Sequence, residues 1–261
     1  MPSKYFPPNS NFYLSYTYQY ESNQKYTLVF LHDSLGCISL WRDFPAQLSQ
    51  KNGMNALIYD RAGYGTAAKV PQLAERGGNY HEVEADLLIP FLKHLNIENP
   101  ILFGHSDGAT IALIAAGKHP NYIKGCIVEG AHSFVEEITL KGIIQAKSAY
   151  TKKDVLHQKL TKYHGDKVHQ LFMAWTETWL EPSFKSWNIF SFLTQITCPV
   201  FVLQGELDEF GTLEQVHVIL DKVKGEKQEL ILRDTGHSPH KEHPEIVYKG
   251  VSQFLADYFG Q

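Results

Sequence analysis

A serine stands between two glycines in the segment Gly104-His105-Ser106-Asp107-Gly108, which has the form G-x-S-x-G. The apolar residues 101–103 precede this segment and the alanine-rich residues 109–118 follow it, so the expected order is strand, tight turn, helix. That order is typical of a nucleophile elbow, in which side chains at the two glycine positions would collide with neighbouring backbone. We therefore expect Ser106 to be a nucleophile at the positive end of a helix dipole.

A serine hydroxyl needs a base, and two later segments supply candidates. Asp208 follows the apolar run FVLQG, and His237 follows the run ELILRD. Both residues would lie just past the carboxyl end of a strand, at the sheet edge where Ser106 is expected. In the chain order serine, acid, histidine, His237 would take the proton from Ser106 and Asp208 would orient the imidazole.

Other acids remain alternatives to Asp208. Glu206 and Asp234 lie beside the two predicted partners and could be flanking surface residues. Glu129 ends the apolar run 123–129, a position where some related folds carry their acid. Asp208 is the preferred acid.

The loop that carries the histidine resembles a metal cluster in composition, with His237, His240, His243, Glu242 and Glu245. Pro239 and Pro244 prevent the continuous helix that would align such ligands, and no H-E-x-x-H pattern occurs. We therefore predict no metal site and no cofactor, with His240 and His243 as the rival histidines.

Acyl transfer also needs N–H donors aimed at the oxyanion of the tetrahedral intermediate. The backbone N–H of Asp107, directly after the nucleophile, is one expected donor. The second should come from the loop after the apolar run 26–31, where alignment with an H-G-x-G loop selects the backbone N–H of Ser34.

Apolar strands and amphipathic helices alternate along most of the chain, which predicts an α/β fold with a mostly parallel sheet flanked by helices. The expected strands cover residues 11–20, 26–31, 55–59, 100–103, 123–129, 198–204 and 228–232. The expected helices cover residues 41–51, 80–95, 107–119, 212–223 and 244–259. Pro90 should kink or split the second of these helices.

The segment 133–194 interrupts this alternation with helical patterns, no convincing strand and three of the four tryptophans. We predict an α/β core domain formed by residues 1–132 and 195–261, and a helical cap formed by residues 133–194 over the carboxyl edge of the sheet. The predicted pocket residues are Leu35, His105, Trp175 and Trp179.

Together these motifs resemble the α/β-hydrolase fold superfamily with a helical cap. The likeness rests on His32 to Gly36 followed by Trp41, on the D-x-R-G-x-G-like turn 60–65, on the elbow, and on 205–208 with 236–237. It covers about residues 10 to 260 apart from the cap. The resemblance, closest to small capped esterases of bacterial type, implies this fold and a Ser-His-Asp triad.

Two positions depart from the family pattern. Asp33 stands where the family's loop has a glycine, and Ala62 shifts the glycine of the following turn by one position. Serine at position 106 separates the chain from the haloalkane-dehalogenase and epoxide-hydrolase branches, which by the same resemblance use an aspartate nucleophile.

Composition narrows the class of function. The 261 residues include 24 Lys and Arg and 28 Asp and Glu, a net charge of −4 that does not favour a nucleic-acid partner. No apolar run approaches the roughly 20 residues of a membrane span, and residues 1–10 lack the pattern of a signal peptide. Three cysteines, Cys37, Cys126 and Cys198, do not suggest a disulfide framework, so a cytoplasmic protein is expected.

We therefore expect a cofactor-free serine hydrolase, a carboxylic ester hydrolase by class, with a small or medium ester or thioester as its small-molecule substrate. Three alternatives stay open: a carbon–carbon bond hydrolase of a dienoate or diketone, an acyltransferase, and a non-catalytic ligand-binding member of the fold. The sequence does not select the substrate or the oligomeric state.

Overall fold

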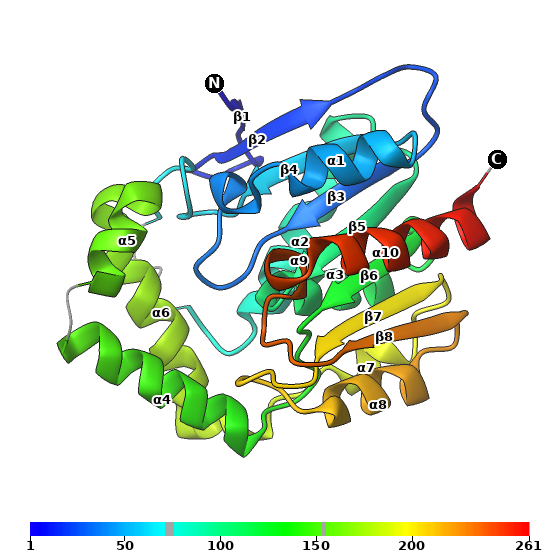
Figure 1. Cartoon of the computed structure of the whole chain (residues 1–261). Coiled ribbons are helices and arrows are strands. Elements are labelled where there is room, and N and C mark those ends of the chain that lie inside the picture. The colour runs from blue at the N-terminus through cyan, green and yellow to red at the C-terminus, as the bar shows by residue number, and fades with distance from the viewer. Residues whose placement is uncertain (71–75, 153–154, 261) are drawn as a thin grey trace.

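A single mixed sheet forms the centre of the computed structural model, which describes residues 1–70, 76–152 and 155–260 (Figure 1). Its strand order is β1-β2-β4-β3-β5-β6-β7-β8. The strands are β1 (Ser3–Tyr5), β2 (Leu14–Gln19), β3 (Thr27–Leu31), β4 (Asn55–Asp60), β5 (Pro100–His105), β6 (Gly125–Glu129), β7 (Val200–Gly205) and β8 (Lys227–Leu232). The first two strands are antiparallel to their neighbours, and all pairs from β4 to β8 are parallel. The predicted α/β class is confirmed.

Five of the parallel strands are buried along their whole length, as their continuous apolar runs predict. All seven expected strands form with small shifts at their ends. Strand β1 was not expected, because three residues are too few to show a period of two. Parallel pairing brings the carboxyl ends of β3, β5, β6, β7 and β8 to one edge of the sheet.

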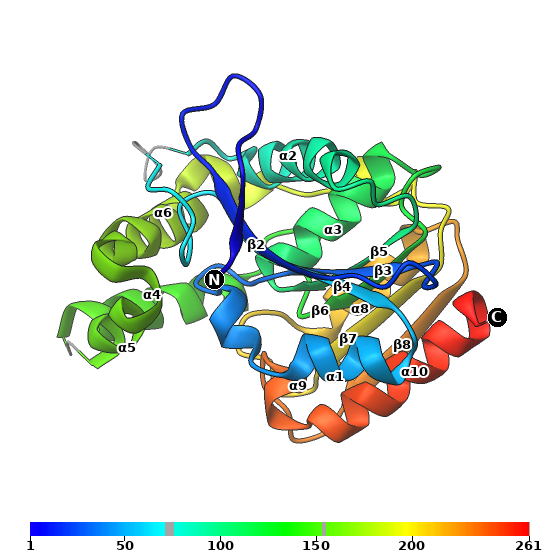
Figure 2. The same ribbon diagram turned by 90° about the horizontal axis from the view of Figure 1, so that it is seen from above.

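Helices cover both faces of this sheet (Figure 2). On one face, α1 (Phe44–Lys51) and α10 (Pro244–Phe259) contribute Leu48, Val251 and Phe254 to an apolar cluster. On the other face, α2 (Tyr80–His94), α3 (Asp107–Lys118) and α8 (Leu213–Lys222) form the second cluster with the strands. The short helix α9 (Pro239–Glu242) precedes α10.

Two predicted helices differ from the structure. The expected helix 41–51 is divided into the 3-10 helix η1 (Ile38–Trp41) and α1, because Arg42 takes a positive φ of 52°. Helix α2 is not split at Pro90. Pro90 and Asp86 are both exposed, so water can reach the Asp86 carbonyl that has lost its N–H partner.

The segment between β6 and β7 is helical, with α4 (Glu137–Lys152), α5 (Val155–His164), η3 (Gly165–Lys167), α6 (Val168–Leu180), η4 (Pro182–Ser186) and α7 (Phe190–Leu193). Helices α4, α5 and α6 lie together at one end of the sheet, and both views show them to one side of it (Figures 1 and 2). Helix α7 instead packs with α3, on the face of the sheet that α2, α3 and α8 cover, and Leu193 joins the apolar cluster there. The division into core and cap at residues 133 and 194 stays a prediction.

Every helix in the described ranges is too short or too polar to cross a lipid bilayer.

Candidate active site

Ser106 lies in a strained turn between β5 and α3. Its backbone has φ 55° and ψ −120°, which side-chain-bearing residues rarely adopt. The Ser106 N–H donates to the Glu129 carbonyl at 2.8 Å, which ties the turn to the end of β6. A Cβ at Gly104 would overlap the backbone of Gly108 and Ala109, and one at Gly108 would overlap the Leu31 carbonyl. The two glycines therefore stand where the turn leaves no room for a side chain.

His237 and Asp208 form a hydrogen-bonded pair beyond the ends of β8 and β7. His237 Nδ1 and Asp208 Oδ2 are 2.8 Å apart, and the Asp208 side chain is buried. Gln204 Nε2 donates to the same carboxylate oxygen at 2.7 Å, and the Phe210 N–H donates to Oδ1 at 2.8 Å. These donors fix the carboxylate, which in turn orients the imidazole.

The electrostatics of the pair favour a charged carboxylate. Burial acts to raise the pKa of Asp208, but the charge and hydrogen bond of His237 outweigh it and the pKa lies below its usual value. Burial acts to lower the pKa of His237, but the charge and hydrogen bond of Asp208 leave that pKa raised. A histidine held in this way can take up a proton and keep it through a reaction step.

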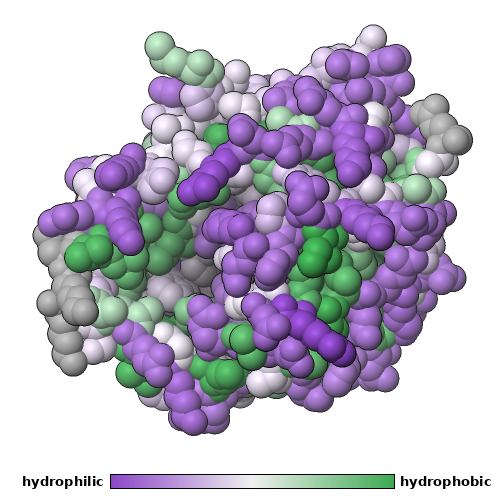
Figure 3. All heavy atoms as spheres, in the orientation of Figure 1, coloured by the Kyte–Doolittle hydropathy of each residue, from purple (hydrophilic) through white to green (hydrophobic). Residues whose placement is uncertain are grey.

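Ser106 and His237 line one cavity of about 240 Å³ at the carboxyl edge of the sheet. Ser34, Asp107, Leu35, Trp175 and Trp179 also line it, so the structure brings these predicted residues together. No hydrogen bond joins Ser106 and His237 in this structure, and such catalytic hydrogen bonds often form or tighten only when substrate is bound. Hydrophobic residues gather around a hollow on this face, on the side where α4, α5 and α6 lie (Figure 3).

Two backbone N–H groups at the cavity have the positions expected of oxyanion donors. Ser34 follows β3, and Asp107 is the first residue of α3. Within the described ranges, neither N–H has a hydrogen-bond acceptor. An acceptor atom of a ligand bound next to Ser106 could therefore use both.

His105, predicted as a pocket residue, does not line the cavity. Its ring is buried behind the elbow, and its Nε2 donates to the His237 carbonyl at 2.8 Å. The cause is strand geometry, because neighbouring residues at the end of β5 point to opposite sides. Burial is the largest effect on this ring and lowers the pKa of His105 to about 3, so the ring is neutral. It contacts the histidine loop and not the cavity.

The rival acid Glu129 and the rival histidine His240 pair with each other. Glu129 Oε1 accepts hydrogen bonds from His240 Nδ1 at 2.6 Å and from the His240 N–H at 3.3 Å, and both side chains are buried. The acids Glu206 and Asp234 are exposed, and neither contacts His237 through a hydrogen bond or ion pair in the described part of the chain. Asp208 is thus the acid that the structure brings to His237.

The predicted absence of a metal site stays a prediction. Among the described residues, the group with closely spaced ligand atoms is His105, Glu129 and His240, and not the loop cluster considered from composition. Hydrogen bonds already engage one ring nitrogen of each histidine and one oxygen of the glutamate. These hydrogen bonds join Glu129 to His240 and His105 to the His237 carbonyl.

Sequence reasoning missed several residues of the cavity wall, namely Asp33, His132, Thr139, Ile143, Glu209, Phe210 and Ser238. Phe210 and Glu209 follow Asp208 directly, and His132 follows the end of β6, so position after a strand could have indicated them. Thr139 and Ile143 lie on α4, where nothing in the sequence shows which helical face points to the cavity.

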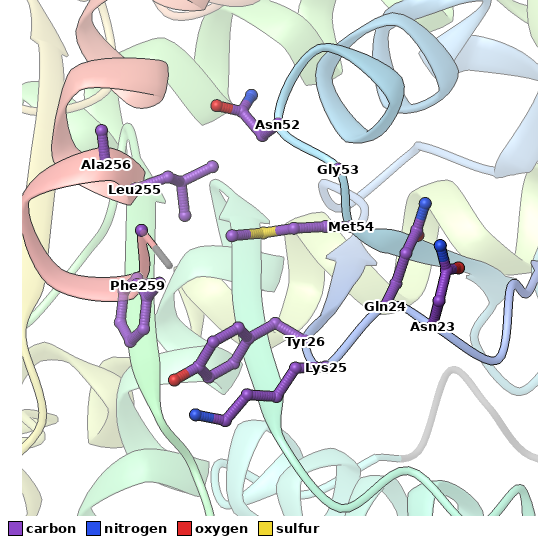
Figure 4. A pocket seen from close by; sticks show the side chains of 11 residues that line it. Asn23, Gln24, Lys25, Tyr26, Asn52, Gly53, Met54, Leu255, Ala256 and Phe259 are labelled. Carbon is purple, nitrogen blue, oxygen red and sulfur yellow. The ribbon is translucent and has the colours of Figure 1, made fainter.

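A larger groove of about 420 Å³ lies at the opposite edge of the sheet, between the residues that precede β3 and β4 and the end of α10 (Figure 4). Met54 and Leu255 point into the same space there (Figure 4). Its lining, as far as the structure describes it, contains no serine, cysteine or histidine. Volume alone therefore does not identify the reactive site.

Comparison with known proteins agrees with this architecture. A family model described as the alpha/beta hydrolase fold matches residues 26–188. The mouse protein "Serine hydrolase BPHL" from Mus musculus is 26% identical over 248 residues, covering 91% of this chain and 82% of that protein. A 2-succinyl-6-hydroxy-2,4-cyclohexadiene-1-carboxylate synthase from Salmonella newport is 25% identical over 252 residues, covering 88% of this chain and 93% of the synthase.

Among solved structures, a carboxylesterase structure from the thaumarchaeon Nitrososphaera gargenis has a TM-score of 0.81 at 19% identity, with 98% of each chain covered. That likeness shows the fold. The chain belongs to the α/β-hydrolase fold family. Family membership and the relatives' names support hydrolase activity.

Proposed function

We propose that this chain is a serine hydrolase that cleaves a small or medium carboxylic ester or thioester through an acyl-enzyme intermediate. One observation carries the proposal: the strained serine of the elbow lines one cavity together with His237, whose ring is hydrogen-bonded to the buried Asp208. Ser106 Oγ would attack the carbonyl carbon while His237 Nε2 takes its proton. The N–H groups of Ser34 and Asp107 would hold the oxyanion.

The proton then passes from His237 to the leaving alcohol or thiol as its bond to the acyl carbon breaks. Water attacks the acyl-enzyme, His237 accepts a proton from that water, and Ser106 is released with the acid product. In this proposal the helices of residues 133–194 form the cap, and Trp175 and Trp179 form its apolar wall. The small volume of the cavity favours a short acyl group.

The charge of the cavity wall separates this proposal from carbon–carbon bond cleavage of a dienoate. Among its described lining residues none is Lys or Arg, whereas Asp33 and Glu209 are acidic. An anionic substrate would meet like charges and no cationic partner. The relatives named as synthases have a carboxylate in their product's name, and the wall of this cavity disfavours that type of ligand.

The test combines covalent labelling with turnover. A fluorophosphonate should label the wild type on Ser106, and Ser106→Ala should lose both labelling and hydrolysis of p-nitrophenyl esters, by a factor on the order of 10⁴ or more. Ser191→Ala is the matched control, because Ser191 is exposed on α7 and does not line the cavity. Turnover that survives in Ser106→Ala would contradict the proposal.

A panel of p-nitrophenyl esters then measures the pocket. Activity should fall as the acyl chain outgrows the cavity, and a hemisuccinate ester should be a poorer substrate than the neutral butyrate ester of similar length. A preference for the anionic ester would favour the alternative class instead.

A further inference from the structure

Arg61 is a buried arginine to which the proposed reaction gives no role. It follows β4 at the carboxyl edge of the sheet, and its side chain is 0% exposed. Its guanidinium lies 4.4 Å from the centre of the Tyr64 ring. Its Nε and Nη1 have no hydrogen-bond partner within the described residues. Burying a guanidinium with so few partners is costly for stability, so its remaining contacts call for an explanation.

The first of these contacts is to the peptide group that carries one proposed oxyanion donor. Arg61 Nη2 donates to the Asp33 carbonyl at 2.8 Å, and His32 Nδ1 lies 2.8 Å from the same oxygen. That carbonyl and the Ser34 N–H belong to one planar trans peptide, in which they point in opposite directions. Holding the Asp33 oxygen therefore fixes the direction of the Ser34 N–H. A cationic donor on the oxygen also polarises the peptide and strengthens its N–H as a donor.

The second contact is to the residue that carries the other proposed donor. Arg61 Nη2 lies 3.8 Å from Asp107 Oδ2, and both side chains are buried. Asp107 Oδ1 accepts hydrogen bonds from the Tyr80 hydroxyl at 2.9 Å and from His81 Nε2 at 3.1 Å. Burial acts to raise the pKa of Asp107, but His81 and Arg61 hold it well below its usual value, so the carboxylate is charged. The carboxylate of Asp107, a residue that lines the cavity, is thus contacted by three side chains, those of Arg61, Tyr80 and His81.

We propose that Arg61 is a positioning residue of the oxyanion hole, which aligns the Ser34 N–H through the Asp33 carbonyl and the Asp107 N–H through the Asp107 carboxylate. This inference rests on the proposed function, because it assigns a purpose to the same hole. Arg61 touches no substrate, since it does not line the cavity. Its effect is exerted on the transition state, where negative charge develops on the oxyanion, more than on the bound ester.

The network also reaches α6, in the helical segment at one end of the sheet. Trp179 Nε1, on α6, donates to the Tyr80 hydroxyl at 2.9 Å, and that hydroxyl donates to Asp107. Trp179 lines the cavity as well. Tyr80→Phe therefore removes one support of Asp107 while the ring keeps its place, which makes it a second and milder variant.

The experiment compares Arg61→Lys with a control on β4, the strand that directly precedes Arg61. Asn55 begins β4, is buried, and bonds the Gln24 carbonyl and the Glu21 N–H far from the cavity. Asn55→Ala should lower the Tm without changing kcat. Arg61→Lys should lower kcat about 10- to 100-fold with KM nearly unchanged.

A trifluoromethyl ketone provides the second readout. When Ser106 Oγ bonds to its carbonyl carbon, the serine proton goes to His237 and the former carbonyl oxygen becomes an anion in the hole. The inhibition constant should rise in Arg61→Lys by the same factor as kcat falls, and Tyr80→Phe should change both about 3- to 10-fold. The proposal is overturned if Arg61→Lys has a lower Tm but an unchanged kcat and an unchanged inhibition constant.

Two further outcomes also test the proposal. If Arg61→Lys does not fold, Tyr80→Phe decides, and unchanged kcat and inhibition constant in that variant overturn the proposal. If the wild type neither labels on Ser106 nor hydrolyses esters, the proposed function fails. In that case the NMR amide resonance of Ser34, compared between Arg61→Lys and Asn55→Ala, still shows whether Arg61 holds this peptide. A resonance that moves equally in both variants overturns that claim too.

Discussion

Asp208→Asn replaces one oxygen of a carboxylate that is surrounded by hydrogen-bond donors. His237 Nδ1 and Gln204 Nε2 face Oδ2 at 2.8 and 2.7 Å, and the Phe210 N–H faces Oδ1 at 2.8 Å. In either orientation the new amide NH₂ group would face at least one donor. When that NH₂ takes the Oδ2 position, His237 Nδ1 must become the acceptor. The proton then sits on Nε2, which can no longer take the proton of Ser106.

The wrong tautomer lowers kcat by about 10⁴ in enzymes with this type of triad, which corresponds to about 5.4 kcal/mol of transition-state stabilisation. We expect a loss of that size for Asp208→Asn in p-nitrophenyl ester hydrolysis. Glu206→Gln, two residues away and exposed, is the matched control and should behave as the wild type. An Asp208→Asn enzyme that keeps most of its activity would refute the assignment of the acid.

The same variant should shift the pH dependence of the residual activity. Catalysis needs neutral His237, so kcat/KM falls as the pH drops through the pKa of that ring. Burial acts to lower this pKa and the Asp208 carboxylate raises it above its usual value. Removing this charge leaves only the smaller effects of Glu209 and Asp33 to oppose burial, so the pKa of His237 should fall and the acidic limb should move to lower pH. A limb that stays in place would show that another group titrates there.

Two further substitutions test the framework of the site. Gly104→Ala should lower the free energy of unfolding by about 1–3 kcal/mol, measured by urea denaturation, because its Cβ would overlap the backbone of the next turn; a fully stable variant would contradict the elbow geometry. His164 Nε2 donates to the Leu35 carbonyl and its Nδ1 accepts the Gly65 N–H, both at 2.9 Å. His164→Phe should therefore lower the free energy of unfolding, in the same assay, by about 1–3 kcal/mol for each of these two groups that is left buried without a partner. Burial lowers the pKa of His164 in the folded protein, so its ring gains a proton in the unfolded chain first, and the wild type loses stability below about pH 6.5. The variant lacks this ring and should lose less stability on acidification. An identical loss in both proteins would show that His164 does not contribute to it.

The sequence predicts the features of the site that depend on local geometry. Gly104 and Gly108 are recognisable because a tight turn between strand and helix limits residue type within a few positions. Asp208 and His237 are recognisable because each follows an apolar strand and parallel strands end at one edge. These predictions needed only neighbours in the chain and the sheet order that alternation implies.

The buried polar contacts could not be predicted in this way. Glu129 is an acid at a strand end, just as Asp208 nearly is, and only its contact with His240, 111 residues later in the chain, shows that it is engaged elsewhere. Arg61 resembles an exposed turn residue by type, because arginine is almost never fully buried unless it is paired. Its partners are the Asp33 carbonyl, in the loop after β3, and the Asp107 carboxylate, at the start of α3. Such roles depend on packing between distant segments, which a single sequence does not record.

Glu129 links the nucleophile and the base although it takes no part in the proposed proton transfer. The backbone of Ser106 is held in a region that costs of order 1–3 kcal/mol, so other contacts must keep it there. The Glu129 carbonyl accepts the Ser106 N–H. The Glu129 carboxylate accepts two hydrogen bonds from His240, which lies on α9 just after His237. His105 also holds the main chain at His237, because its Nε2 donates a hydrogen bond to the His237 carbonyl. One residue at the end of β6 therefore fixes Ser106 through its main chain and helix α9, which directly follows His237, through its side chain. The relative position of the two reacting groups thus depends on buried contacts between distant segments.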